Sequence, residues 1–212
     1  KRTSSYYTSI ELTTIMMDEL INNMEESYKK TLFDKTFLEP CVGTGNFVFA
    51  YLSSCCKLGF TKEQYKKLID NIYVCDINQS ALNQYILNLR MFVKRVFSVS
   101  LDEEYFCNHV KGGLLFDLSS DEISYIPLNK VFGDNISKRG FDIIATNPPY
   151  KNLKAERKQY PNSAEYEKDR KKYETISRLS ENYFEYNNKG VLNIYKLFTE
   201  EIIKRYCSDK GF

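Results

Sequence analysis

The feature that most constrains the fold is a run in which a short apolar strand leads through a glycine turn into an apolar helix. Thr36–Pro40 (TFLEP) has the pattern of a strand, CVGTGNF is a glycine-rich turn, and VFAYLSSCCKL has the pattern of a helix. A strand, a turn and a helix in this order open a parallel α/β unit. Gly43 and Gly45 allow a tight turn and a close approach of a ligand, because glycine has no Cβ.

Further stretches predict that this unit is repeated. Asn71–Asp76 has the pattern of a second strand, His109–Leu115 of a weaker third one and Phe141–Ala145 of a fourth. The helix predicted from Gln79 to about Val99 carries one apolar stripe, made of Leu82, Tyr85, Ile86, Leu89, Phe92, Val93 and Val96. The polar stretch SSDEISYIPLN predicts a connector. We expect an α/β fold, doubly wound around a mostly parallel sheet.

Two helical patterns flank these strands. Residues 1–30 predict an N-terminal helical element whose apolar face packs on the core. That face consists of Leu12, Ile15, Met16, Leu20, Ile21 and Met24. The second pattern, GVLNIYKLFTEEIIKRYC, runs through Ile194, Leu197, Phe198, Ile202 and Tyr206.

Residues 151–190 are charged and rich in tyrosine, with little apolar periodicity, and we interpret them as an insertion or lid. Two interpretations of the charges stay open. The cations Lys151, Lys154, Arg157 and Lys158 either contact a phosphate backbone or form a solvated face. Interleaved acids favour the solvated face, and these are Glu165, Glu167 and Asp169.

Composition excludes several classes of protein. A net charge of +2 is too small to indicate a nucleic-acid binder by itself. The six cysteines form no C-x-x-C pair and there is one histidine, so we expect free thiols and no metal site. No apolar run reaches the length of a membrane span and the N-terminus lacks the pattern of a secretory signal, so we expect a cytoplasmic protein without a membrane partner. The 212 residues fit one domain, which we expect to be part of a longer chain.

Three groups lie at the predicted carboxyl ends of strands, where ligands bind in open α/β sheets: the glycine turn, Asp76 and the turn after Ala145. A dinucleotide fingerprint requires a third glycine, and Val48 stands there instead. Asp76 either accepts hydrogen bonds from both hydroxyls of a ribose or serves as a turn residue, and Glu39 either binds an ammonium group or caps the loop. These features indicate a nucleoside without a diphosphate.

The stretch FDIIATNPPY ends a strand in a stiff turn, because proline fixes φ and donates no hydrogen bond. An exocyclic amine on an aromatic base is a poor nucleophile until two acceptors draw it toward tetrahedral geometry. The side-chain carbonyl of Asn147 and the backbone carbonyl of Pro148 can supply them, and Tyr150 offers a face for an unstacked base. This interpretation requires a base flipped out of the duplex.

These motifs together resemble the S-adenosylmethionine-dependent DNA methyltransferases that act on adenine N6. In that family a tyrosine-threonine element, here SSYYTS, precedes a loop like LEPCVGTGNF, an acid ends the second strand as in VCDIN, and NPPY follows the fourth. This order resembles the arrangement called gamma, and VFGDNISKRGFDIIATNPPY and GVLNIYKLFTEEIIKRY resemble the restriction-modification branch. The resemblance implies a Rossmann-like methyltransferase topology and makes residues 1–212 part of a methyltransferase catalytic domain that acts on a flipped adenine in double-stranded DNA.

The resemblance also implies the roles of individual residues. The turn Asn147, Pro148, Pro149 and Tyr150 would hold the target adenine. The cofactor S-adenosylmethionine would be bound by Tyr7, Thr8, Glu39, Pro40, Gly43, Thr44, Gly45, Asn46, Phe47, Asp76 and Ile77. Tyr7 and Thr8 would touch its methionine end.

The sequence departs from the family pattern in three places. Ser9 replaces the proline that usually follows tyrosine-threonine, and Gly113 stands where an acid would recognise the adenine of the cofactor, so Asp117 either substitutes or the contact is absent. The late motifs and the target-recognition region are expected in a missing C-terminal region or a partner chain. We also expect an incomplete sheet in which the strand before NPPY is an edge with unpaired backbone groups, unless another segment covers it.

Two alternatives remain. A methyltransferase acting on protein glutamine or on RNA also presents an amide or amino nitrogen to a turn like NPPY, although such relatives tend to have a plainer glycine loop and to lack the tyrosine-threonine element. A catalytically idle module that binds cofactor or DNA is the second alternative.

Overall fold

The computed structural model describes residues 8–113, 116–118, 122–137, 139–186, 190, 192–209 and 211–212. The chain divides into two compact units. The sheet unit holds the described residues of Tyr6–Leu114, Leu128–Asn147 and Cys207–Phe212, and the hairpin unit holds those of Leu115–Pro127 and Pro148–Tyr206.

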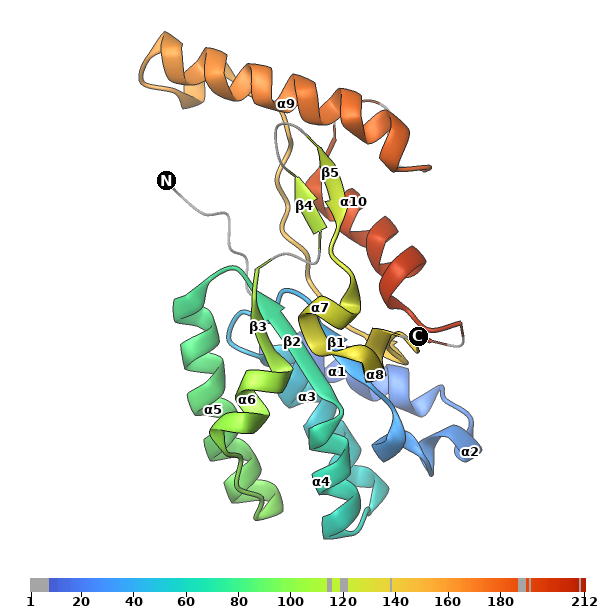
Figure 1. Ribbon diagram of the computed structural model, residues 1–212. Helices are drawn as coiled ribbons and strands as arrows, with labels where there is room; N and C mark the ends of the chain where they lie inside the picture. Colours follow the sequence, from blue (N-terminus) through green and yellow to red (C-terminus); the bar gives the residue numbers. More distant parts are fainter. Residues whose placement is uncertain are drawn as a thin grey trace. The chain divides into compact units, whose positions relative to one another are not determined.

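The sheet unit is built on the four predicted parallel strands. They are β1 (Phe37–Glu39), β2 (Ile72–Asp76), β3 (Val110–Gly112) and β6 (Ile143–Ile144), in the order β3-β2-β1-β6 (Figure 1). In register, Phe37 lies opposite Ile72 on one side and Ile143 on the other. The predicted α/β class and the parallel sheet are confirmed.

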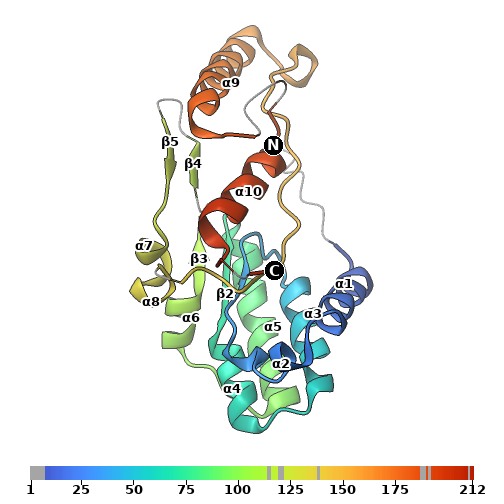
Figure 2. The ribbon, with the colours of Figure 1, turned by 90° about the vertical axis from the view of Figure 1, so that its right-hand side faces the viewer.

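Helices cover both faces of this sheet (Figure 2). On one face Phe37 stacks on Tyr51 of α3 (Asn46–Cys55), with ring centroids 4.5 Å apart. On the other, Tyr73 packs 4.7 Å from His109 of α6 (Glu103–His109) and 5.3 Å from Phe132 of α7 (Leu128–Phe132). A short helix, α8 (Asp134–Ser137), follows α7. Alternate strand residues therefore face opposite helical layers.

Of the helices that the structure describes in the sheet unit, α4 (Lys62–Asp70), α6, α7 and α8 were not predicted. Two of these, α4 and α6, each begin at a capping residue. The side chain of Thr61 accepts from the backbone of Gln64 while the Gln64 side chain accepts from the backbone of Thr61, which is a capping box. The predicted helix after β2 is confirmed as α5 (Gln79–Phe97). Of its predicted stripe, Val96 is exposed instead of buried.

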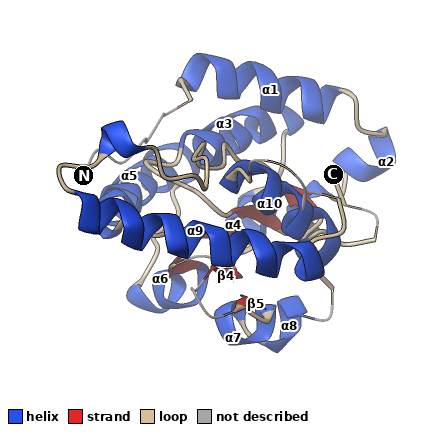
Figure 3. Cartoon of the chain, turned by 90° about the horizontal axis from the view of Figure 1, so that it is seen from above, coloured by secondary structure: helices blue, strands red, loops and turns tan. Residues whose placement is uncertain are grey.

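The N-terminal helical element is interrupted and is turned differently from the prediction. It consists of α1 (Ile10–Asn22) and α2 (Glu26–Lys29), and α1 lies along α3 (Figure 3). Met17, Ile21 and Met24 are buried, as is Thr13. Leu12, Ile15 and Met16 are 51%, 60% and 44% exposed, so their predicted place in the core is wrong. The Thr13 hydroxyl can be buried because it donates to backbone carbonyls of Ser9, Ile10 and Asn46.

The edge of β6 is covered by the chain's own residues 207–209 and 211–212. Ser208 N donates to Phe141 O at 2.8 Å, Phe212 N to Asp142 O at 2.8 Å, and Ile144 N to Phe212 O at 3.0 Å. A Cβ on Gly211 would lie 2.5 Å from the Cys207 sulfur, so this approach requires glycine. The expected unpaired edge is therefore wrong at these residues, and the alternative of a covering segment is confirmed.

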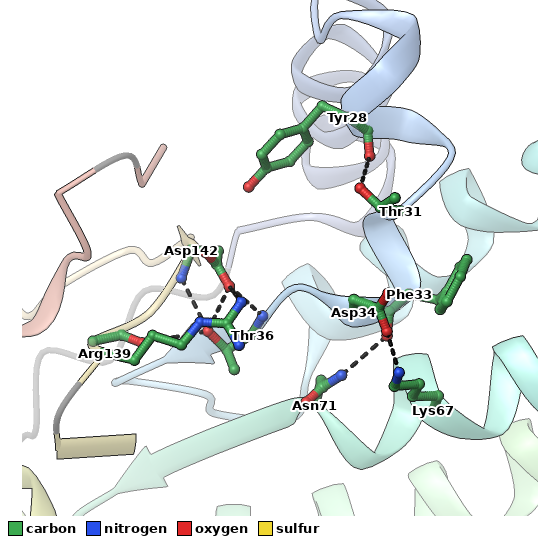
Figure 4. Close-up of polar contacts among 10 residues, drawn as sticks. Tyr28, Thr31, Phe33, Asp34, Thr36, Lys67, Asn71, Arg139 and Asp142 are labelled. Atoms are coloured by element: carbon green, nitrogen blue, oxygen red, sulfur yellow. Dashed lines mark hydrogen bonds and ion pairs between the residues drawn. The ribbon is translucent and has the colours of Figure 1, made fainter. Parts of the chain in front are cut away.

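A buried carboxylate joins the amino ends of β1 and β6 (Figure 4). Asp142 Oδ2 accepts from the backbone N–H and the hydroxyl of Thr36 at 2.9 and 3.0 Å, and Arg139 lies 3.3 Å away. Figure 4 also shows Asp34, in the turn before β1, paired with Lys67 of α4. These contacts align β1 with its neighbour β6, the two strands that lead to the glycine turn and to Asn147.

The hairpin unit combines an antiparallel hairpin with two helices. The strand β4 (Phe116–Leu118) pairs with β5 (Ile123–Tyr125). Because β5 lies within the stretch SSDEISYIPLN, the prediction of a polar connector there is wrong. Within residues 151–190, a turn, η3 (Arg157–Gln159), precedes the helix α9 (Ser163–Tyr183), which contacts β5. The predicted late helix is α10 (Ile194–Glu201), which continues as the π-helical turn η4 (Ile202–Tyr206).

The described residues show neither a membrane-spanning helix nor a metal cluster. No helix in these ranges combines the length and apolarity that a membrane crossing requires. Likewise, no three of their His, Cys, Asp and Glu side chains come together as a metal site. The six cysteines are free thiols.

Candidate functional site

The glycine turn folds back over the carboxyl ends of β1 and β2. Val42 N donates to Cys75 O at 2.9 Å, and Gly45 N donates to Val42 O at 2.8 Å. Gly43 and Gly45 have φ of 53° and 97°, a region that favours glycine. A Cβ on Gly45 would lie 2.6 Å from a Tyr85 ring carbon and 2.8 Å from one of Phe49. The turn is therefore fixed by packing against the Tyr85 and Phe49 rings as well as by its own hydrogen bonds.

Asp76 braces this turn. Its Oδ2 accepts from Gly43 N at 2.8 Å and its Oδ1 accepts from Asn78 N at 2.8 Å. The side chain thus acts as a turn residue that links β2 to the glycine loop, which was one of its two predicted roles. Its backbone carbonyl accepts from Gly113 N at 3.1 Å, where Gly113 has a φ of 99°. Each carboxylate oxygen keeps a second lone pair for a ribose hydroxyl.

Glu39 is a buried carboxyl group at the end of β1. Glu39 is 2% exposed, and its Oε2 atom has no hydrogen-bond partner within the described part of the protein. Burial raises the pKa of Glu39 well above its ordinary value of 4.5, the backbone N–H of Val48 opposes the shift, and the Asp76 carboxylate adds to it. A buried polar atom without a partner is costly, so this position fits a ligand that donates a hydrogen bond.

Cys41, in the same turn, is not suited to nucleophilic chemistry. Burial, together with the nearby Asp76 carboxylate, raises the pKa of its thiol to about 12. A protonated, largely buried thiol is a weak nucleophile.

Thr8 joins the glycine turn to the NPPY motif. The Asn46 side chain donates from Nδ2 to Thr8 O at 2.7 Å, and Asn147 donates from Nδ2 to Thr8 Oγ1 at 2.9 Å. Next to it, Ser9 caps α1 by accepting from Leu12 N at 3.3 Å. The serine that replaces the family proline therefore has a structural role. Three motifs far apart in the sequence meet at Thr8.

The other predicted cofactor residues of the sheet unit differ in exposure. Pro40 and Phe47 are buried, Phe47 within the hydrophobic core, whereas Thr44 is half-buried. Ile77 is 70% exposed at the carboxyl end of β2, where an apolar side chain can cover a base. Tyr7 lies outside the described residues. For Asp117 the structure describes the backbone alone, in β4 opposite Ser124, so its proposed replacement of the missing acid stays a prediction.

The rest of the NPPY motif follows Asn147 directly in the chain and belongs to the hairpin unit. Tyr150 is 52% exposed, and its ring centroid lies 5.3 Å from that of Tyr195. In the residues that follow Tyr150, Ile194 N donates to Lys151 O at 2.9 Å and Leu153 N donates to Leu192 O at 2.8 Å. The segment after the two prolines is thus tied to the start of α10 and presents an aromatic face.

Sequence reasoning missed the contribution of Thr13. Its hydroxyl donates to the Asn46 backbone carbonyl at 3.3 Å. Asn46, at the start of α3, therefore contacts both Thr13 of α1 and Thr8 just before α1. A threonine among more apolar neighbours carries no periodic signal, which is why Leu12, Ile15 and Met16 were wrongly assigned to the buried face.

Comparison with models of protein families shows to which family this chain belongs. The model of the Eco57I restriction-modification methylase family matches residues 70–212, more than half of the chain. The chain belongs to this methylase family. The matched region includes Asp76 and the whole NPPY motif. No curated protein sequence matches the chain.

Solved structures support the same fold. The DrdV–DNA complex matches with a TM-score of 0.64 and 17% identity over 97% of this chain and 20% of that one. The ATP-dependent type ISP restriction-modification enzyme LlaBIII bound to DNA matches with a TM-score of 0.61 and 15% identity over 97% and 14%. A modification subunit assigned to a type I restriction enzyme of Vibrio vulnificus YJ016 gives 0.52 and 17% over 95% and 30%. This chain therefore spans less than a third of each of these chains.

Proposed function

We propose that this chain forms the catalytic part of a DNA methyltransferase that moves a methyl group from S-adenosylmethionine to N6 of an adenine flipped out of double-stranded DNA. The observation that carries the proposal is the meeting of Asn147 with Thr8 and, through Thr8, with the glycine turn. It places the amide that would hold an amine beside the loop that would hold a methyl donor. Membership of a restriction-modification methylase family supports the reaction class.

The residues around the turn fit this cofactor. The unpartnered Oε2 of Glu39 suits a donor such as the ammonium of a methionine moiety. Asp76 retains acceptor capacity for a ribose, and exposed Ile77 can cover the adenine ring. Gly43 and Gly45 allow the positive φ angles on which the shape of this turn depends. When bound, S-adenosylmethionine supplies an electrophilic methyl group on a sulfonium.

The chain's own residues then prepare the amine of the target base. The Asn147 side-chain carbonyl accepts one N6 hydrogen and the Pro148 backbone carbonyl accepts the other, which localises the nitrogen lone pair. Pro148 and Pro149 hold these acceptors still because their φ angles are fixed. Tyr150 stacks on the flipped base and offsets part of the cost of unstacking it.

The acceptor of the methyl group can be identified directly. The full-length protein is incubated with methyl-labelled S-adenosylmethionine and with DNA, RNA or protein, and labelled DNA is digested to nucleosides. We expect the label in DNA, as N6-methyladenine. Label in protein or RNA, or on another base, would refute the proposal, and the first two outcomes would support the alternative methyltransferases. The target-recognition region is expected outside this chain, and a cytoplasmic location stays a prediction.

A further inference from the structure

We infer that Thr8 is a positioning residue for Asn147, and that Asn46 fixes Thr8 to the glycine turn. The inference rests on the proposed function, and it assigns Thr8 a second role besides the cofactor contact that the family resemblance implies. The observation is a continuous chain of hydrogen bonds from α3 through Thr8 to the NPPY motif.

Thr8 contacts the end of the amide that the reaction does not use. An asparagine side chain has a donor end and an acceptor end, and the proposed reaction needs the acceptor. Because Asn147 Nδ2 donates to Thr8 Oγ1 at 2.9 Å, the orientation of the carbonyl oxygen is fixed as well. Loss of the hydroxyl would remove a contact that orients the amide, and a misplaced acceptor lowers the rate of the chemical step.

Thr8 itself is held from the other side. Its backbone carbonyl accepts from Asn46 Nδ2 at 2.7 Å, while the Asn46 carbonyl accepts from Thr13 Oγ1 at 3.3 Å. Thr13 is fully buried, and Asn46 is the first residue of α3, directly after the glycine turn. The position of Asn147 is therefore coupled to the loop that would hold the methyl donor.

A matched pair of substitutions tests the inference. Thr8→Val keeps the shape of the side chain and removes the hydroxyl, whereas Thr8→Ser keeps the hydroxyl. In the full-length protein we expect Thr8→Val to lower kcat about fivefold to tenfold, the effect of one hydrogen bond, and to weaken the Kd for S-adenosylmethionine by a smaller factor than it lowers kcat. Thr8→Ser should retain at least about half of the wild-type kcat.

The Asn46 bond is tested by a double-mutant cycle. Asn46→Ala should also lower kcat. In the Asn46→Ala/Thr8→Val double variant, the fold-loss in kcat should be smaller than the product of the two single fold-losses, because both substitutions act through the position of the Asn147 amide. A Thr8→Val variant with wild-type kcat would overturn the inference. A weaker Kd with unchanged kcat would assign Thr8 to the cofactor alone.

A readout independent of turnover separates this inference from the proposed function. The side-chain amide protons of Asn147 can be assigned in asparagine-labelled protein by their loss in Asn147→Ala. We expect them to exchange with solvent at least about tenfold faster in Thr8→Val than in Thr8→Ser. Equal exchange rates overturn the inference even in an active enzyme, whereas a wild-type protein that transfers no methyl group refutes the proposed function alone.

Discussion

The two units of this protein bury glutamates for different purposes. In the hairpin unit Glu200 is 5% exposed, and its carboxylate accepts from Glu185 N at 2.6 Å and from Tyr186 N at 3.2 Å. In the sheet unit Glu39 is as deeply buried, yet Oε2 has no partner in the described structure. A satisfied buried carboxylate stabilises its surroundings, whereas an unsatisfied one costs stability. The comparison supports the proposal that Glu39 binds a ligand.

The units also differ in what holds them together. The sheet unit has a contiguous core of aliphatic and aromatic side chains from its strands and covering helices. The hairpin unit adds charged contacts to its apolar residues, such as Arg205 stacked 5.2 Å from the Tyr183 ring and paired with the buried Glu201 at 3.1 Å. Burial raises the pKa of Glu201, and Arg205 opposes that shift.

The largest effect is expected at the glycine turn of the sheet unit. Gly45→Ala would place a Cβ 2.6 Å from Tyr85 at a φ of 97°, and we expect it to lower the free energy of unfolding by about 3 kcal/mol. Gly59→Ala is the control, because Gly59 also has a positive φ, 67°, but no atom within 4 Å of the added Cβ. It should cost about 1 kcal/mol. Equal losses in chemical denaturation would show that the turn is not fixed by packing.

The hydrophobic pattern predicted the sheet unit well because that unit is built by apolar burial. Phe37, Tyr73 and Ile143 lie in strands that the sequence predicts, and α5 begins at the predicted residue. The pattern failed at Thr13, whose hydroxyl donates to two local backbone carbonyls and to that of Asn46, 33 positions away. The capping box at Thr61 and Gln64 was a local signal that could have predicted α4.

The comparison of the two glutamates predicts stability changes of opposite sign. Glu200→Gln should lower the free energy of unfolding by about 1–3 kcal/mol, because two backbone N–H groups lose a charged acceptor. Glu39→Gln should raise the free energy of unfolding at neutral pH, because glutamine carries no charge that burial would penalise. The same variant should bind S-adenosylmethionine more weakly, and calorimetry would measure that affinity.

The pH dependence of this stabilisation follows from the raised pKa of Glu39. Below about pH 4.5 the Glu39 carboxyl group is protonated in both the folded and the unfolded protein, so Glu39→Gln should not raise the free energy of unfolding there. As the pH rises above 4.5 the unfolded chain ionises first, so the wild type loses stability until the folded group also ionises. Denaturation at a series of pH values measures this difference. A stability gain that is independent of pH would contradict the assignment.

The site was less predictable than the sheet. The glycine turn, Asp76 and Asn147 follow from local motifs, but the use of both Asp76 oxygens by backbone N–H groups depends on how β2 meets the turn. The bond between Thr8 and Asn147 joins residues 139 positions apart, and no periodic pattern reports it. The polar contacts that hold α9 and α10 are equally invisible to a hydrophobic pattern.

The smallest effect concerns the charged face of α9. Lys151 lies 5.6 Å from the Tyr173 ring and Lys158 pairs with Glu156 at 3.2 Å, so these predicted phosphate contacts have partners within the chain. On α9, Arg170 pairs with two of the nearby acids, Glu167 at 2.9 Å and Glu174 at 3.2 Å. Helical spacing places the exposed residues Lys168, Lys171 and Arg178 on one neighbouring stripe.

Salt dependence tests whether this stripe meets DNA. We expect the Lys168→Gln/Lys171→Gln/Arg178→Gln variant to reduce the slope of log K for DNA against log salt concentration by about one to two, since each lost phosphate contact contributes about 0.9. Lys62→Gln/Lys66→Gln on α4 of the sheet unit is the control and should leave the slope unchanged. An unchanged slope in the first variant would make the stripe a solvated face.

The central claim is that Asn147 holds the amine that receives the methyl group. The most direct measurement compares methyl transfer to DNA by the full-length wild type and by Asn147→Ala, with cofactor affinity measured in parallel. The account predicts a loss of at least about 100-fold in kcat with an unchanged Kd for S-adenosylmethionine. Turnover of Asn147→Ala near the wild-type rate would contradict it.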